Sequence, residues 1–131
     1  MKVSTIDGKK YVWKINGEEV VLDRRNRSSL HVEARAILRE KFPTLQILEE
    51  VSIEVRRGKT LYLDFYIPVR RLAIEVHGEQ HFAYSSFFHK SAQDFMQQKK
   101  NDGDKAEFCE INGIDLIILP FNQVKEWANL L

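Results

Sequence analysis

Hydrophobic and polar residues alternate along the middle of the chain in a pattern that predicts β-strands. The strand-like stretches are residues 46–55, 61–67 and 72–77. They are separated by residues 56–59 and 68–71, which have the length of hairpin loops. Because connections this short join antiparallel neighbours, we expect this part of the sheet to be antiparallel.

Apolar residues at helical spacing predict three helices around these strands. The helices are expected at residues 28 or 29 to 41, at residues 91–112, with a break near residues 101–103 left open, and from Asn122 onward. Pro43 ends the first helix, Gly113 caps the second and Asn122 caps the third. Residues 114–119 are almost wholly apolar and stop at Pro120, which predicts a strand buried on both faces.

The N-terminal region carries a separate hairpin signal. Asn16-Gly17 stands between two alternating runs and favours a type I′ turn, which would pair Trp13 with Val20. A basic linker follows at residues 24–27. We therefore expect residues 1–27 to form a hairpin with a linker, and residues 28–131 to form the main α/β (α+β) domain.

An aromatic-rich stretch follows Gly78. It contains Phe82, Tyr84, Phe87 and Phe88. Core packing is the commoner use of such residues and is our expectation, and a lip on which nucleic-acid bases stack is the alternative.

Length and composition restrict the class of protein. The 131 residues suffice for one domain, and 44% hydrophobic with 30% charged residues is ordinary for a soluble protein. No apolar run approaches the roughly 18 residues of a membrane span, and the first ten residues lack a signal-peptide core. Cys109 is the only cysteine, which excludes an internal disulfide and a cysteine-rich zinc site. We expect an intracellular, cytoplasmic protein with no membrane partner.

Two acidic residues in the predicted hairpin are placed to act together. If residues 68–71 form the loop, Asp64 lies opposite Glu75, and Tyr62 lies opposite His77. Neighbouring carboxylates repel unless a cation neutralises them, and Mg²⁺ or Mn²⁺ takes carboxylate oxygens and water. The sequence thus predicts a metal site at Asp64 and Glu75. The alternative is that both acids are solvated or paired with arginines.

His77 lies two residues after Glu75, on the same predicted strand face. An imidazole there can transfer a proton at neutral pH, which typically contributes a factor of about 10²–10⁴. The alternative is a structural histidine bonded to Tyr62.

The run Glu75-Val76-His77-Gly78-Glu79-Gln80-His81 resembles the Glu-x-Asp-Gly-x-x-His run of Vsr-like domains. With Asp64 before it and Asp102 and Lys105 after it, the stretch is similar to the very short patch repair (Vsr) branch of the PD-(D/E)XK nuclease superfamily, and to the EDxHD homing endonucleases of phage. The likeness covers roughly residues 28–121. It departs from the superfamily pattern at His77, where a lysine is usual, and in lacking the cysteine-rich zinc site of the repair enzymes.

The resemblance implies a restriction-endonuclease-like fold with a mixed four-stranded sheet flanked by helices. It implies that Asp64 is the principal metal ligand, and that Glu33, on the first helix, faces the same site. His77 and His81 match two histidines of the repair enzymes, and Lys105 matches a basic position on the helix behind the site. The expected activity is Mg²⁺-dependent hydrolysis of DNA, in a bacterial or phage-like setting.

DNA binding would need the basic clusters to share one side of the fold, because the net charge is only +1. The residues expected to contact nucleic acid are Arg24, Arg25, Arg27, Arg56, Arg57, Lys59, Lys99 and Lys100. Each cluster alone is more often a solvated surface. So small a domain also suggests a homodimer or a part of a larger DNA-processing protein. An inactive DNA-binding module of the same fold and a protein-interaction subunit are the competing hypotheses.

Overall fold

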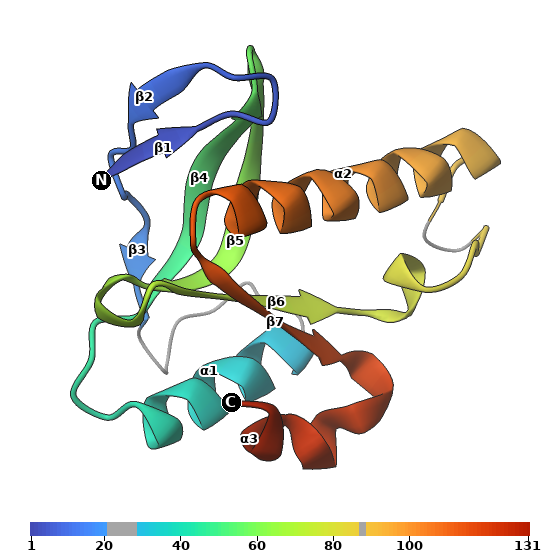
Figure 1. Cartoon of the computed structure of the whole chain (residues 1–131). Coiled ribbons are helices and arrows are strands. Elements are labelled where there is room, and N and C mark those ends of the chain that lie inside the picture. The colour runs from blue at the N-terminus through green and yellow to red at the C-terminus, as the bar shows by residue number, and fades with distance from the viewer. Residues whose placement is uncertain (21–28, 87–88) are drawn as a thin grey trace.

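The computed structural model describes residues 1–20, 29–86 and 89–131. Within this part of the chain, a mixed five-stranded sheet has the order β3-β4-β5-β6-β7 and a two-stranded sheet pairs β1 with β2 (Figure 1). The strands are β1 (Lys2–Ser4), β2 (Lys10–Val12), β3 (Glu18–Glu19), β4 (Leu48–Arg56), β5 (Lys59–Ile67), β6 (Leu72–His77) and β7 (Asp115–Pro120). The helices are α1 (Ser29–Lys41), α2 (Ala92–Ile111) and α3 (Trp127–Leu130), with 3₁₀ turns η1 (Pro68–Arg70), η2 (Glu79–His81) and η3 (Phe121–Glu126).

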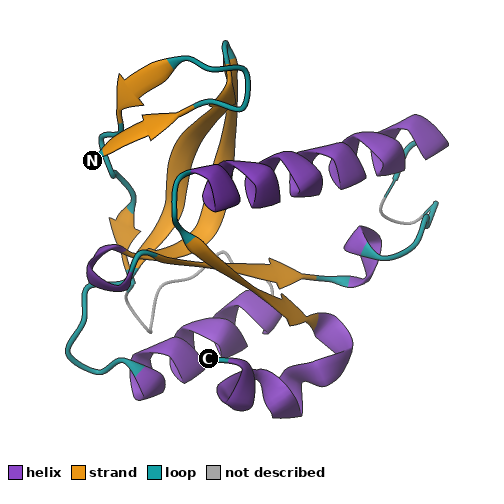
Figure 2. Ribbon diagram, in the orientation of Figure 1, coloured by secondary structure: helices purple, strands orange, loops and turns teal. Residues whose placement is uncertain are grey.

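Helices cover both faces of the larger sheet (Figure 2). On one face, Ala34 and Leu38 of α1 and Trp127 of α3 pack in one buried cluster with Phe65 and Ile74 of the sheet. On the other face, a second cluster joins the α2 residues Phe108 and Cys109 to Tyr66 and Ala73. The expected mixed sheet flanked by helices is confirmed, but within the described residues it has five strands instead of the expected four, because β3 pairs with the edge of β4. Within the described residues, no helix is long and apolar enough to cross a membrane.

The central strands lie where the sequence predicted them. β4 pairs with β5 and β5 with β6, in both cases antiparallel, and Ile67 lies opposite Leu72 as expected. β7 runs parallel to β6. The prediction that residues 114–119 form a strand buried on both faces was wrong, because β7 is the edge of the sheet and within it only Leu119 is buried.

The N-terminal hairpin is built from other residues than expected. Antiparallel β1 and β2 form it, and β3 after Gly17 pairs instead with β4. Gly17 has φ +150° and lies so close to β4 that a Cβ atom would be 2.6 Å from the Glu49 carbonyl oxygen. Glycine is therefore needed here for close approach, not for a type I′ turn. Val3 and Trp13 are buried in the same core as β4, β5 and α2, whereas the predicted boundary at residue 27 lies outside the described residues.

The helix ends differ from expectation mainly at the C-terminus. α2 is unbroken, Ser91 caps its start by accepting a hydrogen bond from the Asp94 N–H, and Gly113 follows its end with φ +67°. The last predicted helix begins instead as the 3₁₀ turn η3, with Pro120 rather than Asn122 preceding it. A regular α-helix starts only at Trp127.

Candidate functional site

Asp64 and Glu75 meet where β5 and β6 separate. The ladder of paired residues ends with Phe65 opposite Ile74. Beyond it, the Asp64 backbone N–H donates to Glu75 Oε2 at 2.6 Å, and the Val76 N–H donates to Asp64 Oδ2 at 2.8 Å. The two side chains thus take the place of backbone carbonyls as acceptors. The structure brings together the two acids that the sequence selected.

Lys105 on α2 completes this group. Its Nζ donates to Glu75 Oε1 at 2.7 Å, and the Glu75 side chain is 2% exposed. Burial, and then the negative charge of Glu75, raise the pKa of Asp64 to about 6. The ammonium of Lys105 opposes this shift only in part. Lys105 pairs directly with Glu75 alone, so the two acids together retain unbalanced negative charge.

A second cluster joins the end of β6 to α2. The rings of His77 and His81 are stacked, with centroids 4.1 Å apart and 9° between the planes. His81 Nδ1 lies 2.9 Å from Asp102 Oδ2, and His77 Nε2 lies 4.0 Å from Asp102 Oδ1. Burial and then His81 lower the pKa of His77 to about 4. His77 is therefore a neutral imidazole at pH 7.

The β5–β6 ladder does not extend far enough to place Tyr62 opposite His77, as the sequence had suggested. Tyr62 is instead 55% exposed. The interpretation of His77 as a structural histidine bonded to Tyr62 is therefore not supported by the structure.

Asp64, Glu75 and Lys105 line one pocket of about 510 Å³, and His81 lines it from the second cluster. Its walls come from the first turns of α1, from β5 and β6, and from η2, α2 and η3. The ionisable side chains among them are His31, Asp64, Glu75, Glu79, His81 and Lys105. The pocket thus gathers carboxylate, imidazole and ammonium groups from elements that are far apart in sequence.

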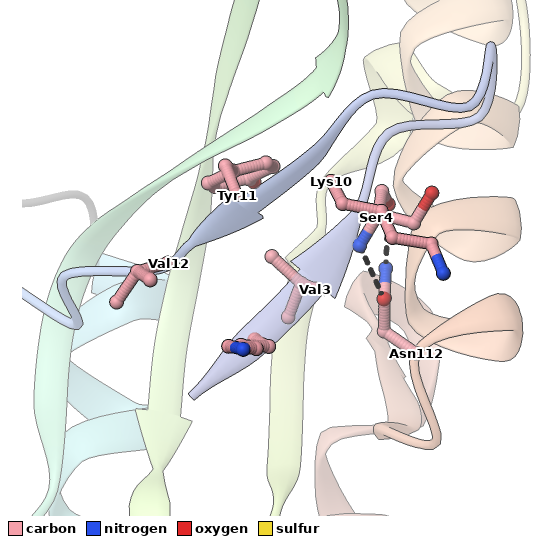
Figure 3. Close-up of a pocket in the computed structure, with 7 residues that line it drawn as sticks. Val3, Ser4, Lys10, Tyr11, Val12 and Asn112 are labelled. Carbon is pink, nitrogen blue, oxygen red and sulfur yellow. Dashed lines mark hydrogen bonds between the residues drawn. The ribbon is translucent and has the colours of Figure 1, made fainter.

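Another pocket, of about 520 Å³, lies across β1 and β2 beside the end of α2 (Figure 3). Its wall includes Lys2, Val3, Lys10 and Val12. The side chain of Asn112 pairs with the backbone of Ser4, accepting from its N–H at 2.8 Å and donating to its carbonyl at 2.9 Å (Figure 3). This pocket is lined by aliphatic and basic groups and does not contain the residues selected from the sequence.

Glu33 does not line the site pocket. It is exposed on α1, one helical turn after the pocket residues Ser29 and Leu30. His31 from the same helix reaches the pocket instead, because the buried side of α1 carries His31, Ala34, Arg35 and Leu38. The helix residue that faces the site is therefore His31, whereas Glu33 was expected there.

A buried ionic network behind the pocket was missed in the sequence. Arg35 Nε donates to Glu49 Oε1 at 2.6 Å, and His31 Nε2 lies 3.3 Å from the same oxygen. His31 also packs its ring on Phe65 with centroids 4.6 Å apart. The only signal in the sequence was the i, i+4 spacing of His31 and Arg35, which gives no indication that Glu49 of β4 faces them.

The predicted nucleic-acid contacts are not equally free to bind. Arg56 and Lys59 pair with Asp104 on α2, at 3.2 and 2.7 Å. Lys99 lies 5.7 Å from the ring centroids of Phe82 and of Phe95. Lys100 and Arg57 are exposed. Arg24, Arg25 and Arg27 lie outside the described residues.

The aromatic stretch is not core where the structure describes it. Phe82 is 48% and Tyr84 49% exposed, so the core-packing prediction was wrong for both. Phe82 packs against His77 and against the pocket residue Phe121, with ring centroids 6.1 and 5.7 Å apart. Phe87 and Phe88 lie outside the described residues.

Comparison with known proteins finds relatives in viruses. Over 65 residues, 49% of this chain, it is 42% identical to uncharacterized protein 094L of Frog virus 3 (isolate Goorha), of which this match covers 42%. It is 36% identical over 64 residues to uncharacterized protein 033L of Invertebrate iridescent virus 3, and 34% identical over 61 residues to uncharacterized protein 307L of Invertebrate iridescent virus 6. These matches cover 49% and 47% of this chain, and 33% and 31% of the relatives.

The chain therefore spans less than half the length of these viral relatives. No family model matches it, and no solved structure matches it. Because each of these relatives is named only as uncharacterized, the function has to be argued from the site.

Proposed function

We propose that the protein is a metal-dependent endonuclease that hydrolyses DNA phosphodiester bonds, related to the Vsr-like branch of the PD-(D/E)XK nucleases. The observation that carries the proposal is the meeting of Asp64 and Glu75 at the point where β5 and β6 separate, on the wall of an open pocket. Two carboxylates held this close favour a cation between or beside them. The Lys105 ammonium pairs with only one of them.

The oxygen atoms of this pair suit Mg²⁺ or Mn²⁺. Asp64 uses Oδ2 to accept the Val76 N–H, and within the described residues Oδ1 takes no hydrogen bond. Both oxygens of Glu75 already accept one hydrogen bond each, from Asp64 and Lys105. Since a carboxylate oxygen has two lone pairs, Glu75 can still offer a ligand without losing these bonds. Asp64 would be the principal ligand and Glu75 the second.

The ion would supply a water of lowered pKa and a Lewis acid for the phosphate oxygens. Lys105 fixes the rotamer of Glu75, so that its carboxylate is already oriented when the ion binds. The same ammonium lines the pocket and can attract a phosphate.

His77 is suited to accept a proton rather than donate one. Its pKa of about 4 leaves it neutral at pH 7, so it has no proton to give as an imidazolium. His81 forms a hydrogen bond with Asp102, and this bond orients the His81 ring. We assign His77 the proton-accepting role and His81 the supporting one.

The second hypothesis is a DNA-binding module of the same fold without turnover. One observation favours it: His77 stands where the superfamily has a lysine, and its low pKa makes it a weak base. A plasmid-nicking assay with Mg²⁺, Mn²⁺ or EDTA separates the two. The endonuclease proposal requires cleavage with either ion and none in EDTA, whereas the binding module gives a gel shift and intact plasmid in all three conditions.

A further inference from the structure

The cluster formed by His77, His81 and Asp102 has the composition of a transition-metal site. Each residue offers one ligand atom, and these atoms all lie within 4.8 Å of one another. Imidazole nitrogen suits zinc and its first-row neighbours, whereas Mg²⁺ prefers oxygen ligands alone. The cluster is thus chemically distinct from the Asp64 and Glu75 pair.

The supporting structure holds these side chains in place. His77 ends β6, His81 is the last residue of the short turn η2, and Asp102 comes from the middle of α2, so a 20-residue helix is fixed against the end of β6. Gln98, one turn earlier on α2, contacts His81 Nε2 at 3.3 Å. Metal-binding histidines commonly have such an outer hydrogen-bond partner, which sets the ring orientation.

His77 is the most informative member of the cluster. It is 9% exposed, and within the described residues neither ring nitrogen takes part in a hydrogen bond. Its Nε2 lies 4.0 Å from Asp102 Oδ1, too far for a hydrogen bond. Ligand atoms around a tetrahedral zinc are roughly 3.4 Å apart, given metal–ligand distances of about 2.0–2.2 Å. This separation is close to what an ion between the two residues would need.

We propose that His77, His81 and Asp102 bind a divalent transition-metal ion, with Zn²⁺ the best match to two imidazoles and one carboxylate. The ligand atoms would shift by roughly 1 Å, and the ion would displace the hydrogen bond between His81 and Asp102 or that between His81 and Gln98. Three protein ligands leave the fourth position to water or to a phosphate oxygen. Such an ion would occupy the imidazole lone pair of His77, so the proton-accepting role of His77 applies to the protein without this ion.

The test is a Co²⁺ titration of chelator-treated protein without a histidine tag, followed by the visible absorption of tetrahedral Co²⁺ and by Zn²⁺ competition. Wild type should bind one ion per chain with the visible absorption of tetrahedral Co²⁺, and any ion at the Asp64 and Glu75 pair should not contribute to that absorption. Replacing a hydrogen-bond partner of a metal ligand typically weakens metal binding by about 10–100-fold, and we expect a loss of Co²⁺ affinity in that range for Gln98→Ala. His77→Ala and Asp102→Asn remove a ligand and should weaken Co²⁺ binding by more than this. Asp64→Asn should bind Co²⁺ as wild type does, because Asp64 belongs to the other site.

Circular dichroism of each variant checks that it folds. Asp102→Asn replaces one carboxylate oxygen by an NH₂ group and is expected to leave the helix intact. If His77→Ala fails to fold, the Co²⁺ affinity of Asp102→Asn is the test of the site. Absence of stoichiometric binding by wild type, or unchanged binding by Asp102→Asn, overturns the site. Loss of Co²⁺ in Asp64→Asn would also overturn it, by placing the ion at the carboxylate pair. Plasmid nicking with Mg²⁺ is scored separately, so failure of either proposal is recognised independently.

Discussion

Asp64 and Glu75 hydrogen-bond across two separating strands, with Glu75 Oε2 accepting the Asp64 N–H at 2.6 Å and Asp64 Oδ2 accepting the Val76 N–H at 2.8 Å. This reciprocal arrangement continues the strand pairing by one residue after the backbone ladder has ended. It also holds two acids together in a partly buried place, at a cost in stability that a cation would relieve.

Replacing Asp64 by Asn should stabilise the metal-free protein. Its pKa is raised to about 6 in the fold from an ordinary value of 3.8, so ionisation opposes folding. The folded state then binds more protons than the unfolded state between about pH 4 and pH 6, and wild-type stability falls as pH rises through that window. Above that window, the free energy of unfolding of Asp64→Asn should exceed that of wild type by on the order of 1 kcal/mol, a value reduced because Asp64 is only partly buried.

Thermal unfolding in EDTA at about pH 4 and about pH 7 measures this difference. The advantage of Asp64→Asn over wild type should be small at the lower pH and larger at the higher one. Asp115→Asn changes an exposed acid on the edge strand and serves as the control. An Asp64→Asn variant that is less stable than wild type at pH 7 would show that the carboxylate is stabilising as it stands.

His77→Ala should separate binding from chemistry in zinc-free protein supplied with Mg²⁺. Asp64 and Glu75 remain, so DNA and Mg²⁺ binding should persist, while single-turnover cleavage falls by on the order of 10²-fold. Because the pKa of His77 is about 4, the imidazole is neutral throughout about pH 6–8.5, and the loss should be constant over that range. If His77→Ala cleaves at a rate within a few-fold of wild type, His77 has only a structural role.

The salt dependence of DNA binding should distinguish free from engaged basic residues. Replacing Arg57 and Lys100 with Ala should flatten the slope of log K against log salt by about 0.9 for each DNA phosphate that the variant no longer neutralises. Arg56→Gln and Lys59→Gln should change the slope less, because Asp104 already pairs with both side chains. Equal effects of the two sets would show that the Asp104 pairs open when DNA binds.

The network behind the pocket should control stability rather than chemistry. Arg35→Met leaves Glu49 buried beside His31 alone and should cost about 3–5 kcal/mol in denaturant unfolding, as removal of one partner of a buried ion pair does. The double variant with Glu49→Gln should recover part of this loss, since no full charge of the pair remains. A loss below about 1 kcal/mol for the single variant would indicate that water reaches Glu49.

The strands that carry the acids could be predicted because their signals are local. Alternation and a four-residue loop set the register of β5 and β6, and that register brings Asp64 beside Glu75. The Asn16-Gly17 signal failed because long-range contact decides it: Gly17 packs against Glu49 of a strand about thirty residues away. Likewise, nothing local reveals that Arg35 and Glu49 neutralise each other inside the fold, or that Phe82 stays at the surface.

Cleavage of supercoiled plasmid by Asp64→Asn, beside Asp115→Asn and wild type, tests the central claim most directly. The proposal predicts that wild type and Asp115→Asn nick DNA with Mg²⁺ and not with EDTA. Asp64→Asn should lose about 10³-fold or more in rate while still binding DNA, since a principal metal ligand is gone but the basic residues that hold the phosphates remain. Nicking by Asp64→Asn at the wild-type rate, or no Mg²⁺-dependent nicking by wild type, would contradict it.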